Sequence, residues 1–396
     1  MFEFADRVSR IQGSLTLAMT SRAAELRAAG QDVINMSVGE PDFPTPAHII
    51  AAGKRAMDEG YTRYTPAAGL PQVREAVVTK LARDNAITVG PSEVIVSNGA
   101  KHSLFNACMA LFQQGDEVII FRPYWVSFPE FVLLANARPV VVGSDPENQF
   151  EPLFDELRDK IGPRTKGIIM NSPSNPTGGV WSRGAVEQII SIAREHNLWL
   201  LSDECYEQLT YDAPFESTAA IGPDYEKILT FQSCSKTYAM TGWRIGYMAG
   251  PEPLVKAMTK IQGQSTSSPN AIAQMAAVAA LTGDQTVVAE MRAAFDRRRQ
   301  LIVSGLAAIP GLACREPGGA FYVFLKVTEL LGRRAGEKIL RTPEDVTGYL
   351  LDEVKIATVN GEGFGDDSHI RLSYALSDRE IATAIERIGA AVKSLD

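Results

Sequence analysis

Cysteine and histidine are both scarce in this chain. Its 396 residues include four cysteines and four histidines. No two cysteines form a C-x-x-C pair, and no histidine has metal-ligand spacing to another histidine or to a cysteine. We therefore expect no metal site, and we expect the thiols to stay reduced, as they do in the cytoplasm.

Long apolar runs and an excess of basic charge are missing as well. No uninterrupted apolar stretch reaches the roughly 18 residues of a membrane-spanning helix, and the N-terminus does not resemble a secretory leader. The 39 basic residues are outnumbered by 47 acidic ones, giving a net charge of −8, which disfavours binding to nucleic acid or to anionic membranes. We expect a cytoplasmic protein that acts on small molecules.

Strand-like and helix-like segments alternate through the first two thirds of the chain. Apolar runs rich in Val and Ile predict strands at residues 93–97, 117–121, 139–142, 167–170, 198–201 and 228–231. Apolar residues at helical spacing lie between them, for example at 184–194. Strands buried on both faces and separated by helices indicate a mostly parallel sheet. We predict a large α/β domain over residues 45–285, with three layers in the order α/β/α.

The pattern changes after residue 285. A long charged helix passes through residues 297–300, and shorter strands are expected at 320–325 and 369–373. Because a chain of this length exceeds the size of most single cores, we predict a second, smaller α+β domain, formed by residues 1–44 and 286–396. The polar segment 331–338 is expected to be an exposed loop.

A lysine among small hydroxyl residues follows the strand at 228–231. Ser233, Ser235 and Lys236 come first, and Arg244 lies further along the same segment. In open α/β sheets the ends of strands line ligand crevices, where burial and cationic neighbours lower the pKa of an amine and make it nucleophilic. Hydroxyls and a guanidinium suit a phosphate. The segment resembles a site where a lysine holds pyridoxal phosphate as a Schiff base; the alternative is a surface loop with a solvated lysine.

Polar residues also follow the strand at 198–201. Asp203 is a candidate partner for a pyridinium nitrogen, because a buried carboxylate keeps that nitrogen protonated, and Tyr206 is a candidate donor to the phenolic oxygen of the ring. Alternatively, Asp203 caps a helix that has Glu204 in its first turn. The spacing to Lys236, which spans one further helix and strand, favours the cofactor interpretation.

Three further strand ends carry candidate ligands. Asn175 lies in Asn-Ser-Pro-Ser-Asn-Pro-Thr-Gly (171–178), where a cis bond to Pro176 and an amide contact to the cofactor are expected, the alternative being a tight turn. Gly99, Ala100 and Lys101 open a helix whose N–H groups would bind phosphate. Trp125 offers a face for stacking on the cofactor ring, although tryptophans are more often part of a core.

Arginine occurs inside a predicted strand near the C-terminus. Arg371 alternates with Ile370 and Leu372 and should face the opposite side, where it is either solvated or binds an anion such as a substrate α-carboxylate. Gly39 and Tyr64 add a carboxylate contact and a phosphate contact.

Together these motifs resemble the class I aminotransferases of the fold-type I pyridoxal-phosphate enzymes, over nearly the whole chain. The carrying segments are 37–43, 171–178, 202–206, 233–246 and 370–374, and segments 123–128 and 239–247 are most similar to bacterial aspartate aminotransferases of the Ib subgroup. The resemblance implies a homodimer with shared active sites. It implies contacts to the cofactor ring from Lys236, Asp203, Tyr206, Asn175 and Trp125, contacts to the phosphate from Gly99, Ala100, Ser233, Ser235, Arg244 and the partner's Tyr64, and a substrate α-carboxylate on Arg371.

The resemblance also bears on the substrate. In the subgroup, positions matching Lys101, Ser14 and Thr16 are associated with acidic side chains, so it implies ping-pong exchange between aspartate or glutamate and 2-oxoglutarate or oxaloacetate, with prephenate as a further acceptor. Ser14 and Thr16 equally fit a helix N-terminus. Alternatives are an aromatic aminotransferase, a β-lyase on the same scaffold, and a cofactor-sensing regulator, for which the sequence offers no helix-turn-helix or basic patch.

Overall fold

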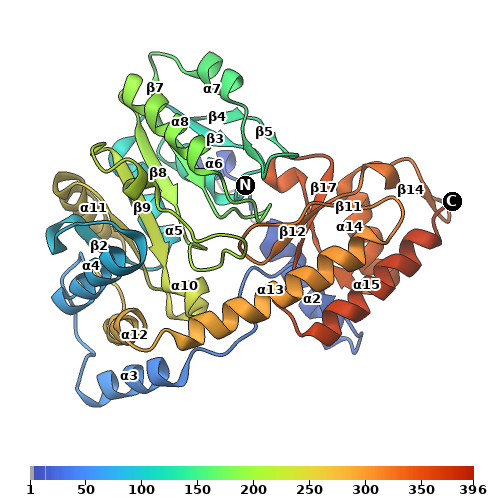
Figure 1. Cartoon of the computed structure of the whole chain (residues 1–396), viewed down its shortest axis with the longest axis horizontal. Helices are drawn as coiled ribbons and strands as arrows, with labels where there is room; N and C mark the ends of the chain where they lie inside the picture. Colours follow the sequence, from blue (N-terminus) through green and yellow to red (C-terminus); the bar gives the residue numbers. More distant parts are fainter. Residues whose placement is uncertain (1–3, 14) are drawn as a thin grey trace.

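The structure, a computed structural model, describes residues 4–13 and 15–396. Figure 1 shows a larger body built on a broad sheet, with a smaller body beside it. Helix α13 (Thr286–Ala307) packs against both, because Val288 at its start joins a core of the larger body while Ile302 and Leu306 join the core of the smaller one. This is the long charged helix that the sequence predicts.

The larger body contains a seven-stranded sheet. Its strands lie in the order β2 (Val94–Ser97), β10 (Gly246–Ala249), β9 (Ile228–Ser233), β8 (Trp199–Asp203), β7 (Thr165–Asn171), β3 (Glu117–Phe121) and β4 (Arg138–Val142). The neighbouring strands β9 and β8, β8 and β7, β7 and β3, and β3 and β4 are parallel. Strand β10 is antiparallel to both of its neighbours, β2 and β9. All six predicted strands are present. The sequence analysis missed β10, a four-residue strand without polar alternation.

Helices cover both faces of this sheet. One face packs against α5 (Ala100–Leu111), α6 (Ser127–Leu134) and α11 (Glu252–Ser265), and the other against α7 (Phe154–Lys160) and α8 (Arg183–Glu195). Neighbouring residues of β7 show the division, since Ile169 joins the first core and Ile168 the second. Each such buried side chain contributes about 1.5–3 kcal/mol relative to an exposed one. The predicted three-layer α/β/α arrangement is confirmed.

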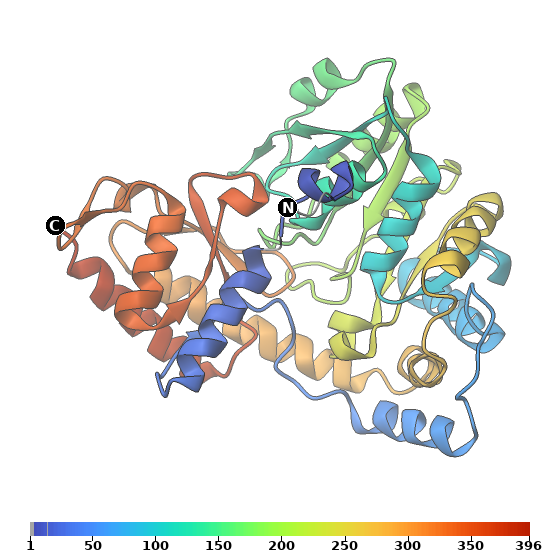
Figure 2. The ribbon, with the colours of Figure 1, turned by 180° about the vertical axis from the view of Figure 1, so that it is seen from behind.

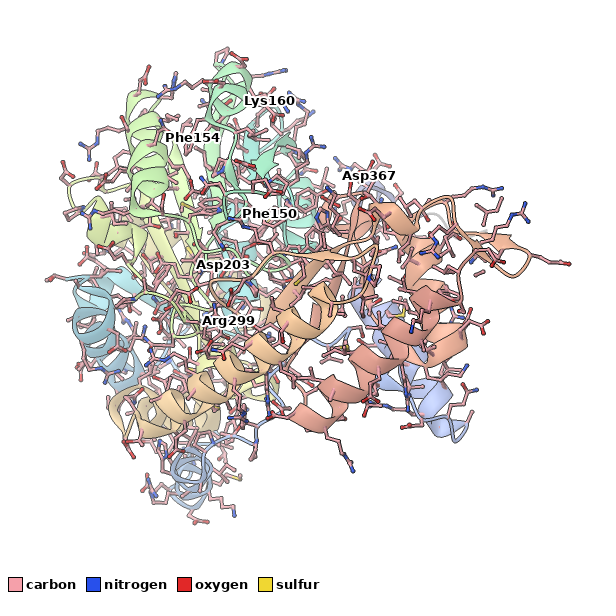
Figure 3. The ribbon with its side chains drawn as sticks, turned by 45° about the vertical axis from the view of Figure 1, so that its right-hand side comes forward. Phe150, Phe154, Lys160, Asp203, Arg299 and Asp367 are labelled. Atoms are coloured by element: carbon pink, nitrogen blue, oxygen red, sulfur yellow. The ribbon has the colours of Figure 1, made fainter. Side chains whose placement is uncertain are left out.

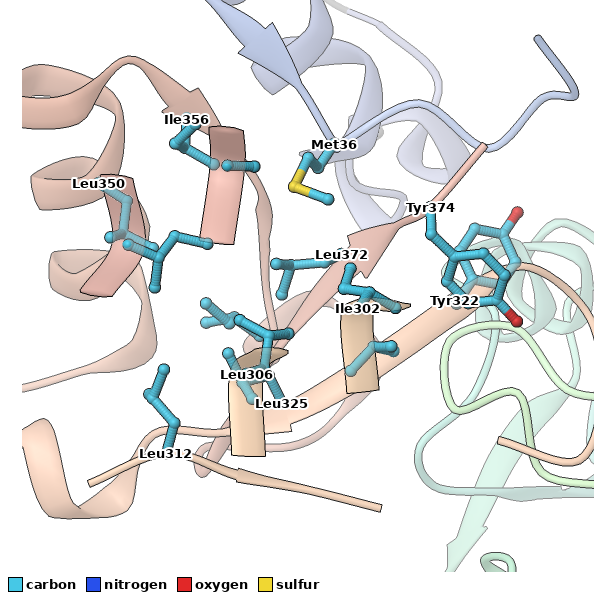
Figure 4. Close-up of a cluster of buried hydrophobic side chains, with 14 of the residues drawn as sticks. Met36, Ile302, Leu306, Leu312, Tyr322, Leu325, Leu350, Ile356, Leu372 and Tyr374 are labelled. Carbon is cyan, nitrogen blue, oxygen red and sulfur yellow. The ribbon is translucent and has the colours of Figure 1, made fainter. Parts of the chain in front are cut away.

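The smaller body is built on a four-stranded antiparallel sheet. Its order is β11 (Ala313–Cys314), β12 (Tyr322–Lys326), β17 (His369–Ser373) and β16 (Val359–Asn360). Helices α13, α14 (Pro343–Val354) and α15 (Asp378–Lys393) pack around a core in which Leu325 and Leu372 meet residues of α13 (Figure 4). The strands expected at 320–325 and 369–373 are therefore present.

Residues 15–35 join the smaller body, whereas Arg10 and the N–H of Gln12 donate hydrogen bonds to Asn136 and Glu130 of the larger body. Strand β1 (Ile34–Asn35) pairs in parallel with β15 (Ile356–Ala357), and α2 (Leu15–Ala28) lies beside them, as the view from behind shows (Figure 2). Placing the domain boundaries at residues 45 and 285 stays a prediction. The loop expected at 331–338 is partly wrong, because β13 (Arg334–Ala335) and β14 (Lys338–Ile339) pair as a short hairpin across its end.

Among the remaining elements, helices α3 (Ala47–Asp58), α4 (Pro71–Asn85) and α12 (Ala271–Thr282) contribute to a further core of the larger body, and the others are short. The short elements are α1 (Asp6–Arg10), α9 (Thr218–Ile221), α10 (Cys234–Thr237), β5 (Ser144–Asp145), β6 (Glu151–Pro152) and the 3-10 helices η1 (Pro91–Glu93), η2 (Thr241–Trp243), η3 (Thr328–Leu330) and η4 (Glu362–Phe364). Within the described ranges, no helix has both the length and the apolar character needed to cross a bilayer.

Candidate active site

A cavity of about 310 Å³ lies at the carboxyl ends of β7, β8 and β9. Twelve of the residues singled out in the sequence line it: Gly39, Ala100, Lys101, Trp125, Asn175, Asp203, Tyr206, Ser233, Ser235, Lys236, Arg244 and Arg371. They come together because parallel strands present their carboxyl ends at one edge of the sheet. Arg371 reaches the same cavity from β17 of the smaller body.

The other four predicted residues are not among those that line this cavity. Tyr64 is 92% exposed and does not line it. Ser14 lies outside the described residues, and Thr16 lies in α2 at a position whose side chain is not described. Gly99 does not line the cavity but lies directly beside it, against Arg244.

One end of the cavity has the donors of an anion site. Helix α5 begins at Ala100, and Ser233 caps the short helix α10 by accepting a hydrogen bond from the N–H of Ser235 at 3.1 Å. The guanidinium of Arg244 is oriented by a hydrogen bond that its Nη1 donates to the carbonyl oxygen of Thr241 at 2.8 Å. Free N–H groups at a helix start, hydroxyls and a guanidinium are the usual ligands of phosphate.

Two glycines make this anion site compact. Gly99 has φ +85, and a Cβ there would lie 2.5 Å from Arg244 Nη2. A Cβ at Gly246, the first residue of β10, would lie 2.2 Å from the backbone nitrogen of Ala100. The glycine that follows Arg244 in the sequence motif is thus required because β10 passes directly beneath the start of α5.

Lys236 is the amine of the cavity. Its Nζ donates to the carbonyl oxygen of Gly39 and lies 6.0 Å from the ring centre of Tyr206. Burial lowers the pKa of Lys236 to about 8, an effect that Glu40 opposes and Arg371 supports. At pH 7 about one molecule in ten then carries the neutral, nucleophilic amine, far more than for an ordinary lysine.

Asp203 is the buried carboxylate of the cavity, and it lies near the middle of the molecule (Figure 3). Its Oδ1 accepts a hydrogen bond from the N–H of Cys205 at 3.2 Å. Desolvation raises the pKa of Asp203 to about 6, although hydrogen bonds from Cys205 and the charge of Lys236 oppose the rise. Asp203 ends β8 and no helix begins there, so the helix-capping alternative is wrong.

Tyr206 is paired with a tyrosine that the sequence analysis missed. Its hydroxyl lies 2.7 Å from that of Tyr322, a residue of β12, and burial raises the pKa of both phenols. The two rings meet edge to face with their centres 5.7 Å apart. A Cβ at Gly39 would lie 2.7 Å from the Tyr322 hydroxyl, so this glycine also allows a close approach.

Arg371 is a buried guanidinium with only neutral partners among the described residues. Its Nη1 donates to Asn175 Oδ1 at 2.8 Å and its Nη2 to the carbonyl oxygen of Ser37 at 2.6 Å, while its Nε is buried without a partner. Ile370 and Leu372 point into the apolar core instead, which confirms the predicted alternation. A buried cation with a spare donor suits an anionic ligand.

The rim of the cavity carries a further cation. Lys101 is exposed, and its Nζ lies 4.9 Å above the ring of Trp125, which packs edge to face on Phe128. Desolvation, together with the charge of Arg244, lowers the pKa of Lys101. Trp125 is partly exposed on the cavity wall rather than enclosed in a core, and its exposed part is available to a flat ligand.

A family model for aminotransferases of class I and II matches residues 31–388. The chain belongs to this family. It is 46% identical over 388 residues to an aspartate aminotransferase of Geobacillus stearothermophilus, with 98% of both chains covered. It is also 44% identical over 390 residues to an aspartate/prephenate aminotransferase of Cereibacter sphaeroides, again covering 98% of each.

The fold agrees with this membership. The structure of this chain is similar to the crystal structure of the aspartate aminotransferase from Rhizobium meliloti, with a TM-score of 0.96, 41% identity and full coverage of both chains. The architecture of this chain is therefore fold type I of the pyridoxal-phosphate enzymes, as the resemblance implies. Family membership makes the chain an enzyme rather than a cofactor-sensing regulator.

In this aminotransferase, six residues that line the cavity were not predicted from the sequence. They are Leu104, Val126, Asn171, Cys205, Thr241 and Tyr322. Asn171 and Cys205 lie within motifs already singled out, and their positions next to Asn175 and Asp203 were the only available clue. Tyr322 had none, because its role depends on the packing of β12 against the loop after β8.

Proposed function

We propose that this aminotransferase binds pyridoxal 5'-phosphate and exchanges an amino group between L-aspartate or L-glutamate and 2-oxoglutarate or oxaloacetate, in two half-reactions. The observation that carries the proposal is the content of one cavity. It holds an amine of lowered pKa, a buried carboxylate, an anion site at the start of α5, and a second arginine with only neutral partners among the described residues.

The residues present fit the proposed cofactor. The cradle at Gly99, which a Cβ would fill, together with Ser233, Ser235 and Arg244 suits its phosphate. When bound, pyridoxal phosphate supplies an aldehyde that accepts the amino group and a ring that withdraws electrons from the substrate Cα–H bond. The carboxylate of Asp203 would hold a proton on the ring nitrogen, and the nearby cation would bring the raised pKa of Asp203 down again.

The other residues would bind substrate and move protons. Arg371 and Asn175 would hold the α-carboxylate beside Gly39. The Nζ of Lys236, once free, would accept the proton that leaves the substrate Cα and deliver it to C4′ of the bound cofactor, and in the reverse half-reaction it would move a proton in the opposite direction. Tyr206 would donate a hydrogen bond to the ring oxygen, and Trp125 would stack on the ring. Both contributions are positional, since they orient the bond that breaks.

Lys101 supports an acidic substrate. It places an ammonium at the rim of the cavity, apart from the guanidinium of Arg371, and a dicarboxylate needs one cation at each end. We propose that Ser14 and Thr16 of the N-terminal segment add hydroxyl contacts there. The name of the relative from Cereibacter sphaeroides supports prephenate as a further acceptor for this chain.

The proposal includes a homodimer with shared active sites in the cytoplasm. Tyr64 is a large aromatic side chain, 92% exposed on the isolated chain, and we propose that it reaches the phosphate of the partner's site. All four thiols are free, which supports a reducing compartment.

The absorbance of the purified protein tests the function. L-aspartate should remove the visible band of the lysine-bound cofactor, and 2-oxoglutarate should restore it. If only L-phenylalanine removes the band, the enzyme is an aromatic aminotransferase, and release of pyruvate from L-cysteine without an acceptor would identify a β-lyase. No band after addition of pyridoxal phosphate would contradict the cofactor itself.

A further inference from the structure

Directly behind the cavity lies a buried polar network that none of the proposed roles uses. Its centre is Lys80 of α4, which is 1% exposed. The Nζ of Lys80 donates to Glu207 Oε1 at 2.5 Å, to Asn85 Oδ1 at 2.6 Å and to Gln232 Oε1 at 2.8 Å. All three ammonium hydrogens are therefore used, and the ligands come from three separate segments of the chain.

Two of these ligands lie next to active-site residues. Glu207 directly follows Tyr206, and Gln232 directly precedes Ser233 in β9. Neither of them lines the cavity, whereas Tyr206 and Ser233 do. In each of these two segments, one residue lines the cavity and its neighbour belongs to the network. Lys80 joins the two neighbours, Glu207 and Gln232.

A second carboxylate extends the network to Asp203. Glu204 is fully buried and accepts hydrogen bonds from Ser217 Oγ at 2.7 Å, from the N–H of Thr218 at 3.0 Å and from Gln232 Nε2 at 3.3 Å. Gln232 is thereby linked to two acidic residues of the turn, directly to Glu204 through its amide Nε2 and indirectly to Glu207 through Lys80. The turn from Asp203 to Glu207 is held on its far side at two points.

The energetics suggest what this network provides. Moving an ammonium and a carboxylate out of water costs several kcal/mol per ion, and replacing a buried ion pair by apolar side chains is often neutral or stabilising. Stability alone therefore gives little reason for Lys80 and Glu207. What charged hydrogen bonds supply and apolar packing does not is a fixed direction between the groups they join.

We propose that Lys80 is a positioning residue of this aminotransferase: by joining Glu207 to Gln232, it sets the turn that carries Asp203 and Tyr206 relative to the segment that carries Ser233 and Lys236. This inference rests on the proposed function. Because both segments would contact the same cofactor, a small shift between them changes both its binding and the protonation of its lysine-bound form.

The test uses the full-length protein with Lys80→Met, Glu207→Gln and the double variant. Lys80→Met alone leaves the Glu207 carboxylate buried and unpaired and is expected to fold poorly. The double variant removes both charges together and keeps the volume of both side chains, so it is expected to fold. The control is Tyr225→Phe, which removes a partly buried hydroxyl bound to the carbonyl oxygen of Ala193, near the opposite end of β8.

Three readouts separate positioning from stability. In the double variant the dissociation constant of pyridoxal phosphate from the apoprotein should rise about tenfold, the pH midpoint of the cofactor absorbance should shift by about 0.5 or more, and kcat for aspartate should fall while KM changes by less than twofold. In Tyr225→Phe the melting temperature should fall without these changes. A double variant with the dissociation constant and pH midpoint of the unmodified protein would overturn the inference. Failure of the unmodified protein to bind pyridoxal phosphate would instead contradict the proposed function.

Discussion

The hydroxyls of Tyr206 and Tyr322 lie 2.7 Å apart, although one residue follows β8 of the large sheet and the other belongs to β12 of the small sheet. The contact lies on the cavity wall, next to Gly39 and Arg371. The proposed substrate site is therefore built from both bodies. Any movement of one body against the other changes the distance between Arg371 and the residues at the ends of β8 and β9.

Replacing Lys236 by alanine should abolish the visible band of the cofactor and reduce turnover by at least about a thousandfold, because the variant loses both the nucleophile and the proton carrier. Absorbance spectra and the mass of the protein after borohydride reduction in the presence of pyridoxal phosphate measure this. Lys256→Ala, at a lysine whose side chain is 71% exposed, is the matched control. A variant that retains the band would contradict the role of Lys236.

Replacing Lys101 by alanine should lower kcat/KM for aspartate by about 10- to 100-fold, the size of one hydrogen bond to a charged group, and leave kcat/KM for phenylalanine nearly unchanged. The reason is that Lys101 is proposed to meet only the distal carboxylate. Steady-state kinetics with both donors measure the ratio. Equal losses for the two donors would mean that Lys101 acts on the cofactor or on the fold instead.

Replacing Arg371 by leucine should lower activity with both donors, unlike the replacement of Lys101, which should affect only aspartate. Both donors carry an α-carboxylate, so kcat/KM should fall by about 100-fold or more for aspartate and for phenylalanine alike. Arg371→Lys should restore little, because a lysine cannot donate to Asn175 and Ser37 in the same planar arrangement. A loss confined to aspartate would mean that Arg371 binds the distal carboxylate instead of the α-carboxylate.

Replacing Asp203 by asparagine should stabilise the apoprotein at pH 7. The pKa of Asp203 is raised from 3.8 to about 6 in the folded state, so its contribution to stability is complete below pH 3.8 and is lost as the pH rises through 6. The difference corresponds to about 3 kcal/mol at neutral pH. Urea unfolding of the variant and the unmodified apoprotein between pH 4 and 8 should show a gain that disappears toward pH 4, and a gain independent of pH would contradict this pKa.

Mixing two inactive variants tests whether active sites are shared. Lys236→Ala lacks the amine, and Tyr64→Ala lacks the aromatic residue that we propose reaches the partner's phosphate. If sites are shared, a mixed dimer contains one site with both residues, so mixing and refolding should recover up to about a quarter of the activity for random assembly. Recovery no greater than the sum of the two separate variants would place Tyr64 outside the partner's site.

Much of the cavity could be predicted because its residues follow strands. Asp203, Asn175 and Lys236 each come just after an apolar run, and parallel strands bring their carboxyl ends to one edge. This grouping depends only on the order of the strands and helices along the chain. Arg371 could be predicted in the same way, from its alternation with two core residues.

Contacts between distant parts of the chain could not be predicted. The partner of Tyr206 is Tyr322, and the ligands of Lys80 include Glu207 and Gln232. Nothing in the local sequence around Tyr322, Lys80 or Gln232 distinguishes these residues from those of an ordinary core strand or helix. Strand β10 was missed for a related reason, since its four residues acquire their role only where Gly246 passes beneath Ala100.

The sequence by itself determined the three-layer architecture and the set of groups at the sheet edge, because apolar periodicity and chain order are local properties that fix which residues follow which strands. The tertiary structure alone decided the pKa of Lys236 and of Asp203, the neutral partners of Arg371 and the network around Lys80. These depend on burial and on directions between segments far apart in the chain, and both arise only when the two bodies and their helices pack together.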